Sequence, residues 1–294
     1  MLQTDTAAAI GAPTAATAGT ASAVTLQTPF AATTDLYRGM PITLSGNPAT
    51  ARTALAIAYT SARVATLSRD FSPVLDTNTQ ALIPINQRLT LSDTEADWPS
   101  LTAYFYFAGQ LMIGVGCQVA NPRITLVAGQ PGFIEYDIVG RLAANPVEAA
   151  LPAGASAVQR PTPPRWDAGE CVFNRAVVRG SRAVFGLGTQ VSLPAAPEES
   201  GGFDLGQIVG RVPTADLSLY ANSTSSPVRT GVMTAGSNVY FSAILGASAA
   251  NRIGILFSPG RITRMTLGSE QRLDVDQITL EAALPNYSFL VTSW

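Results

Sequence analysis

The 294-residue chain contains no histidine and no lysine, so all 18 of its basic side chains are arginine. Without histidine, neither a Ser-His-Asp nor a Cys-His catalytic arrangement can be built from this chain, and zinc or iron sites that use histidine are excluded. Without lysine, the chain has no GxxxxGK[ST] phosphate loop and no Schiff-base lysine. The sequence therefore predicts no catalytic, cofactor-binding or metal-binding residues and a protein that is not an enzyme.

Charge of either sign is scarce. Charged residues make up 13% of the chain, about half of the ~25% found in ordinary globular proteins. The net charge is −2 and the pI is near 5.2, so the basic footprint of a tight nucleic-acid binder is missing. A surface of Thr, Ser, Gln, Asn and Ala suits contact with other protein, and arginine suits interfaces because its planar fork binds carboxylates. A GC-rich genome is the alternative source of the arginine bias.

Cysteines and long apolar runs are also few. Cys117 and Cys171 lie in apolar segments with the pattern of β-strands and are predicted to be reduced core thiols. A secreted domain that is held together by disulfides normally has more cysteines. The chain has no run of ~18 apolar residues, so no transmembrane helix is predicted. The N-terminal residues lack the basic and apolar regions of a signal peptide. We therefore expect synthesis in a cytoplasm and no membrane partner.

Composition divides the chain into four predicted parts. Residues 1–34 are low-complexity Ala, Thr and Gly, which predicts a flexible N-terminal arm. Residues 35–150 are expected to form a first β module, with a short helix in the Ala-rich stretch 49–62. Residues 151–170 are rich in Pro and predict a linker. Residues 171–294 are expected to form a second β module.

Alternation of side chains predicts most of the strands. Apolar and polar residues alternate over 101–107, and a second strand at 111–119 follows a Gly-containing turn, so the pair reads as a hairpin. Residues 132–142 place apolar and charged side chains on opposite faces. Further strands are expected at 171–179, 183–193, 207–220, 238–246, 251–257, 261–268 and 272–284. The predicted fold class is mainly β, a β-sandwich or half-barrel with one or two short helices.

The two halves of the chain resemble each other weakly. Arg123–Leu126 and Arg264–Leu267 each open a strand pair, and these openings are 141 residues apart. The second pair slips in its alternation between Val275 and Ile278, where a bulge would absorb one extra residue. Two similar modules in tandem are therefore predicted, with chance similarity between short strands as the alternative.

Other candidate motifs favour plain interpretations. Glu198-Glu199 and Asp93-Thr94-Glu95 are the densest acidic segments, and a glycosidase would need two acids at a defined separation in a cleft. We interpret them as solvated loop acids. The aromatic run Tyr104–Phe107 could stack on bases, but cross-strand pairing in a β-sheet explains it more simply.

A turn at Ala108-Gly109 is followed along the chain by Ala128–Gly132, Pro163-Pro164 and Ile208–Asp216, and this series of segments resembles bacteriophage tail tube proteins. The resemblance covers roughly residues 63–294 and is clearest over Ser100–Leu142. The family's DG-like turn corresponds to Ala108-Gly109, where the Asp is missing. Matches to its "aGepa" turn, its "tPP" segment and its "itGrkptgsid" strand follow at Ala128–Gly132, Pro163-Pro164 and Ile208–Asp216, with Val212 in place of the Lys.

The resemblance implies a tail-tube-type β-sandwich or half-barrel, the major tail protein of a long-tailed phage with a non-contractile tail. Such subunits form stacked rings that make a hollow conduit for DNA passage into the host. The implied place is the tail of the virion, assembled in the host bacterial cytoplasm. The implied partners are further copies of the chain, the tape measure protein, the tail terminator, the distal tail protein and passing double-stranded DNA, which is not bound sequence-specifically.

Ring size and competing functions remain open at this point. If the duplication is real, three chains would form a pseudo-sixfold ring, and a hexamer is the alternative. The polar loops 72–82 and 193–206 are predicted to bridge neighbouring rings or subunits. Competing interpretations are another β-structural virion protein, such as a decoration or tail-end protein, and an outer-membrane β-barrel, which also has alternating strands and an aromatic C-terminal residue like Trp294.

Overall fold

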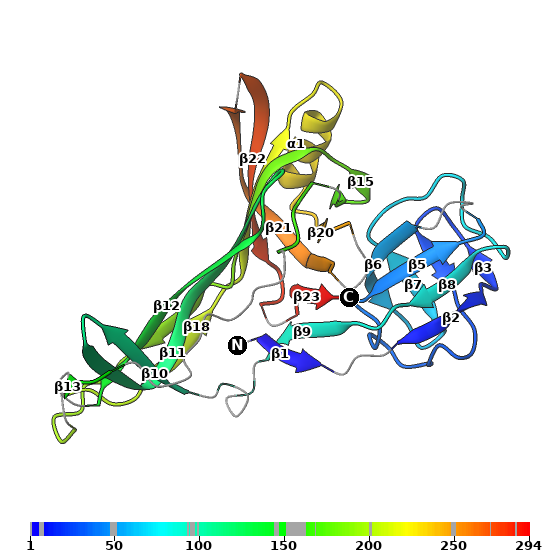
Figure 1. Cartoon of the computed structure of the whole chain (residues 1–294). Helices are drawn as coiled ribbons and strands as arrows, with labels where there is room; N and C mark the ends of the chain where they lie inside the picture. Colours follow the sequence, from blue (N-terminus) through cyan, green and yellow to red (C-terminus); the bar gives the residue numbers. More distant parts are fainter. Residues whose placement is uncertain are drawn as a thin grey trace.

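The protein is mainly β, and its sheets include a curled half-barrel (Figure 1). This confirms the predicted fold class. The computed structural model describes residues 2–5, 9–47, 52–92, 94, 98, 100–143, 147–150, 163–167, 169–199, 202–247, 251–270, 272–285 and 287–294. Within this part of the chain there is one α-helix, α1 (Ser225–Thr234).

The larger sheet, here called the main sheet, is antiparallel throughout. Its order is β1 (Leu2–Asp5), β9 (Gln87–Leu91), β23 (Phe289–Ser293), β21 (Ile253–Glu270), β22 (Leu273–Ala282), β19 (Thr214–Tyr220), β16 (Gly180–Gly186), β11 (Gln110–Val127) and β10 (Leu101–Phe107). Two strands, β12 (Phe133–Leu142) and β13 (Val147–Glu148), add to β11. Beside β21 lie β20 (Val239–Leu245), β14 (Cys171–Phe173) and β15 (Ala176–Val177).

One face of the main sheet carries the core and the other is polar. Successive side chains of a strand point to opposite faces, so Ala183 and Phe185 of β16 enter the core while Arg182, just before Ala183, stays exposed. On β19, Leu217 is buried and its neighbour Asp216 is exposed. The core cluster also holds Phe173, Phe241, Phe257, Ile278, Leu280 and Phe289.

A second sheet lies between β1 and β9 along the chain. Its order is β2 (Ile10–Ala15), β8 (Gln80–Ile83), β5 (Pro41–Ser45), β6 (Arg52–Tyr59), β7 (Val64–Leu67), β4 (Ala23–Thr25) and β3 (Ala18–Gly19). It encloses its own core, which includes Phe30, Tyr37, Met40, Leu44 and Tyr59. Because β1 and β9 pair with each other in the main sheet, residues 10–83 are named the inserted domain.

The inserted domain corrects two predictions. Residues 1–34 are not a flexible arm over their described part, because β2, β3 and β4 belong to this sheet and Val24 and Phe30 are buried in its core. Residues 49–62 are not helical over their described part, because β6 pairs with both β5 and β7 and buries Leu55. Strand pairing on both sides outweighs the helix propensity of alanine.

The sheets divide the chain differently from the predicted modules. The inserted domain ends at residue 83, and one continuous main sheet contains strands from both predicted modules, 35–150 and 171–294. Of the predicted linker 151–170, residues 151–162 and 168 lie outside the described residues. Nearby, Trp166 is buried in the core, and its N–H donates to the Gln130 carbonyl at 3.0 Å.

The two predicted strand pairs are both long hairpins, and the two hairpins match each other in the lengths of their strands. In each hairpin, an 18-residue strand, β11 or β21, pairs with a 10-residue strand, β12 or β22. The predicted bulge between Val275 and Ile278 is wrong, because the register shift of the second hairpin lies on β21 between Ile262 and Arg264. The alternation slips because Asp276 takes a buried position, where it forms an ion pair with Arg229 of α1.

Buried polar contacts attach the inserted domain to the main sheet. The Arg38 guanidinium donates to the carbonyls of Ile57 (3.1 Å), Tyr287 (2.8 Å) and Ser258, and lies 3.5 Å from the Tyr287 ring centroid. The Thr292 hydroxyl donates to the Gly39 carbonyl at 2.7 Å. A small apolar cluster joins the two parts beside these contacts, made by Leu55, Ile244, Leu256, Leu290 and Trp294. The inserted domain is therefore packed against the main sheet.

Candidate assembly surfaces

A largely apolar β arm projects from the main sheet on the side away from the inserted domain (Figure 1). We define this apolar arm as β10, residues 110–120 of β11, and β12. No charged residue occurs between Ser100 and Pro122. Large apolar side chains are nevertheless exposed, among them Phe107 (75%), Ile134 (67%), Tyr104 (60%) and Tyr136 (56%).

The β10–β11 hairpin of the apolar arm is apolar on both of its faces. Tyr104 lies opposite Ile113 on one face, and Phe105 lies opposite Met112 on the other. Cross-strand pairs of this kind stabilise a hairpin, but they leave the outer side of each ring in solvent. Contiguous exposed apolar surface marks an interaction site in soluble proteins. The apolar arm is therefore the first candidate assembly surface.

Besides the outer sides of β1, β10 and β15, each of which has one partner strand, two further strand edges of the main sheet have no partner among the described strands. β12 pairs with β11 along one side only. The second edge is residues 261–270 of β21, which pair with β22 on one side, while the pairing with β20 stops at Gly260. Unpaired edges expose backbone donors and acceptors that template pairing with another chain. These two edges are the second candidate assembly surface.

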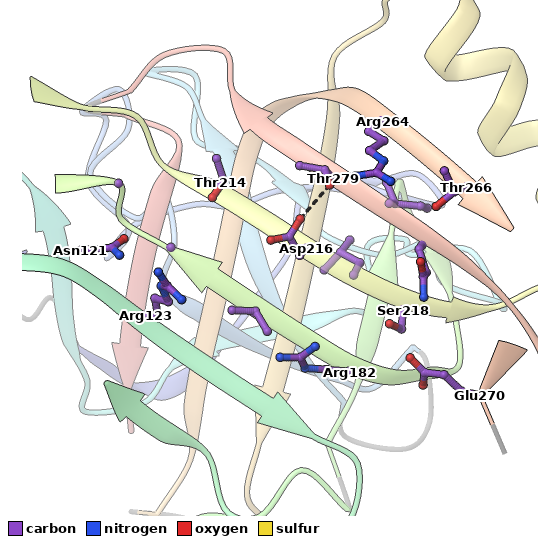
Figure 2. A pocket seen from close by; sticks show the side chains of 16 residues that line it. Asn121, Arg123, Arg182, Thr214, Asp216, Ser218, Arg264, Thr266, Glu270 and Thr279 are labelled. Carbon is purple, nitrogen blue, oxygen red and sulfur yellow. Dashed lines mark hydrogen bonds between the residues drawn. The ribbon is translucent and has the colours of Figure 1, made fainter. Parts of the chain in front are cut away.

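The polar face of the main sheet is hollowed across β11, β16, β19, β21 and β22, with a volume of about 610 Å³ (Figure 2). Arg123, Arg182 and Arg264 share this face with Asp216 and Glu270, which leaves one net positive charge. The Thr279 hydroxyl donates to Asp216 Oδ1 at 2.7 Å, and the Ser181 hydroxyl contacts Glu270. This open face carries mixed charge without an enclosed cleft.

The two loops predicted to bridge neighbours have different structures. Residues 72–82 belong to the inserted domain, where Leu75 and Ala81 are buried and β8 begins at Gln80. A deletion there would remove core, so it would not separate bridging from folding, and whether this segment reaches a neighbour stays a prediction. The loop 193–206 folds back on the apolar arm, where the Gly206 N–H donates to the Gly116 carbonyl at 3.0 Å.

Gly116 is required where this loop meets the apolar arm. Its φ is +59°, and a Cβ there would lie 2.3 Å from the Leu205 side chain. A second contact is the ion pair between Arg141 of β12 and Glu199 of the loop. The loop therefore stiffens one face of the apolar arm, and whether it also reaches a neighbour stays a prediction.

The remaining predicted residues do not assemble into a site. Glu198 and Glu199 are exposed, whereas Asp93 and Glu95 lie outside the described residues. In the described part of the chain, no three His, Cys, Asp or Glu side chains group closely enough to hold a metal ion. Cys117 and Cys171 are free and buried, as predicted, and burial raises the pKa of the Cys171 thiol to about 12.

No helix among the described residues has the length and apolar character needed to cross a membrane. No protein-family model matches the chain, and no curated protein sequence matches it.

Proposed function

We propose that this chain is a structural, non-enzymatic subunit of a phage tail tube, which assembles with its own copies into stacked rings around a hollow conduit for DNA. The observation that carries the proposal is the combination of an exposed apolar arm with two unpaired edges of one curled sheet. Such surfaces are hazards in a monomer and become contacts in a closed ring.

The polar face of the main sheet is the proposed wall of the conduit. Its three arginines are interspersed with Asp216 and Glu270, and Glu135 of β12 lies opposite Arg123 of β11. Each arginine that contacts a phosphate adds affinity that resists movement of DNA. Carboxylates beside the arginines reduce that affinity, so double-stranded DNA would pass without sequence-specific binding.

A ring of three chains is the favoured arrangement. The chain contains two hairpins of equal strand length, each with an 18-residue and a 10-residue strand, which is what a pseudo-sixfold ring of three chains would need. A hexamer is the alternative. In the virion tail, assembled in the bacterial cytoplasm, the further proposed partners are the tape measure protein, the tail terminator and the distal tail protein.

Placing a charge at the tip of the apolar arm is expected to weaken assembly. In Phe107→Asp, a carboxylate replaces a ring that is 75% exposed in the single chain and buried in the proposed contact, where an unpaired charge is costly. We expect the self-association constant from sedimentation velocity to fall at least ~10-fold, since 1.4 kcal/mol already gives this factor. The monomer should unfold at an unchanged denaturant concentration.

The matched control is Ile85→Asp, in the connection between the inserted domain and β9, where the side chain is 84% exposed and lies outside the proposed contact. It should assemble like the unmodified chain. Equal assembly by Phe107→Asp and Ile85→Asp would remove the apolar arm from the proposal. A chain that stays monomeric without any substitution, at all concentrations, would contradict the proposed function itself.

A further inference from the structure

We propose that two of the unpaired edges of the main sheet bind each other between copies: β12 of one chain pairs antiparallel with the outer half of β21 of the next. This inference depends on the proposed function, because it names the contact that would close the ring. The occupant of each edge is a second copy of this chain. Strand direction, side-chain chemistry and charge all bear on this choice.

The directions of β12 and β21 allow copies that are related by rotation to close into a ring. The path from one edge to the other contains six strands, β12, β11, β16, β19, β22 and β21, and each is antiparallel to the next. The two end strands therefore run in opposite directions. When copies are related by rotation about an axis along the strands, β21 of one copy meets β12 of the next as an antiparallel pair. The contact is heterologous, so repetition generates a ring.

The faces of the two edges match in chemistry. On β12, Ile134 lies opposite Ile124 on the core side, and Glu135 lies opposite Arg123 on the polar side. On β21, Met265 lies opposite the buried Ile278, so Met265 and Leu267 face the core side. Arg264 and Thr266 then face the polar side. A pairing that keeps the core side continuous joins apolar residues with apolar residues and polar residues with polar ones.

One register satisfies both faces over five residue pairs. It places Ile134 opposite Leu267, which are 67% and 71% exposed in the single chain. It also places Tyr136 opposite Met265 and Asp137 opposite Arg264, an oppositely charged cross-strand pair. A shift by one residue would turn every side chain to the wrong face.

Shifts by two residues keep the faces but lose contacts. In one direction, Leu267 would lie opposite Gly132, which has no side chain to cover it. In the other, Asp137 would lie opposite Thr266, and the charge pair with Arg264 would be lost. The register that joins residues 133–137 to residues 264–268 is therefore assigned to the contact.

Disulfide trapping tests this pairing. Residues directly opposite in an antiparallel pair have Cα atoms ~4.5–5.5 Å apart, within the range that a disulfide spans. In the double variant Ile134→Cys/Leu267→Cys, oxidation should convert most chains into one covalent closed species of three or six chains on a non-reducing gel. The control Ile134→Cys/Thr266→Cys places the second thiol on the opposite face and should remain uncrosslinked.

A second measurement tests the pairing in the unmodified chain, so it does not depend on whether the cysteine variants fold. In the unmodified chain, amide hydrogen exchange at residues 133–137 and 264–268 should slow at least 10-fold on assembly, because the amides gain partners. Rings that image normally but show neither crosslinking nor this protection would overturn the pairing and leave the proposed function standing. Crosslinking of both cysteine pairs to equal extent would also overturn it. An absence of any oligomer would overturn the proposed function.

Discussion

Asp276→Ala is expected to lower the free energy of unfolding by about 3–5 kcal/mol, because it leaves the Arg229 guanidinium buried without its partner. The two side chains are 2% and 4% exposed. Asp276 also accepts a hydrogen bond from the Ser226 hydroxyl at 2.8 Å. Arg229 is the buried residue of α1, so the substitution should also release the helix from the sheet. Urea unfolding followed by tryptophan fluorescence measures the loss.

Two variants make this prediction specific. Asp216→Ala removes an exposed aspartate from the neighbouring strand β19 and should change the free energy of unfolding by about 0.5 kcal/mol or less. The double variant Arg229→Met/Asp276→Leu removes both charges together and should recover most of the stability. If Asp276→Ala unfolds at the same urea concentration as Asp216→Ala, the ion pair does not hold α1 in place.

Arg38→Ala is expected to lower the free energy of unfolding by about 3 kcal/mol, since hydrogen bonds from charged groups contribute ~1.5–3 kcal/mol each. The side chain is 3% exposed and bonds carbonyls of both the inserted domain and the main sheet. Burial lowers the pKa of Arg38 to about 10, so the guanidinium remains charged at pH 7 and the contact persists. Calorimetry should then resolve two transitions in place of one, because the inserted domain has its own core.

Arg38→Lys keeps the charge but lacks the planar fork that reaches several carbonyls. It should therefore lower the free energy of unfolding, but by less than Arg38→Ala does. Arg182→Ala is the matched control, because this arginine is exposed on the polar face. A single calorimetric transition in Arg38→Ala, at the temperature found for Arg182→Ala, would contradict the role given to Arg38.

The long hairpins are the part of the fold that the sequence predicts best. Alternation over 101–107 and 132–142 predicts strands, and these segments are β10 and β12, although most of their side chains are exposed in the single chain. The inserted domain could not be predicted in the same way. Its Ala- and Thr-rich composition is typical of a disordered segment. Val24 is buried only because β4 pairs with β7, which lies about forty residues later in the chain.

The helix and the assembly edges escaped prediction for different reasons. Residues 225–234 contain Pro227 and Gly231 and have little helix propensity, so α1 depends on the tertiary contact between Arg229 and Asp276. Whether a strand lies at an edge is a property of the whole sheet and leaves no local pattern. The absence of charged residues over 100–122 is a sequence feature that matches the apolar arm, but it was not used to predict it.

Class averages of the purified, unmodified protein in electron micrographs test the central claim most directly. The account predicts closed rings or stacked tubes with a central hole, three- or sixfold in projection, and the polar face around arginines 123, 182 and 264 turned toward the hole. Solid, solitary particles at every protein concentration, with β12 exposed to solvent, would contradict it.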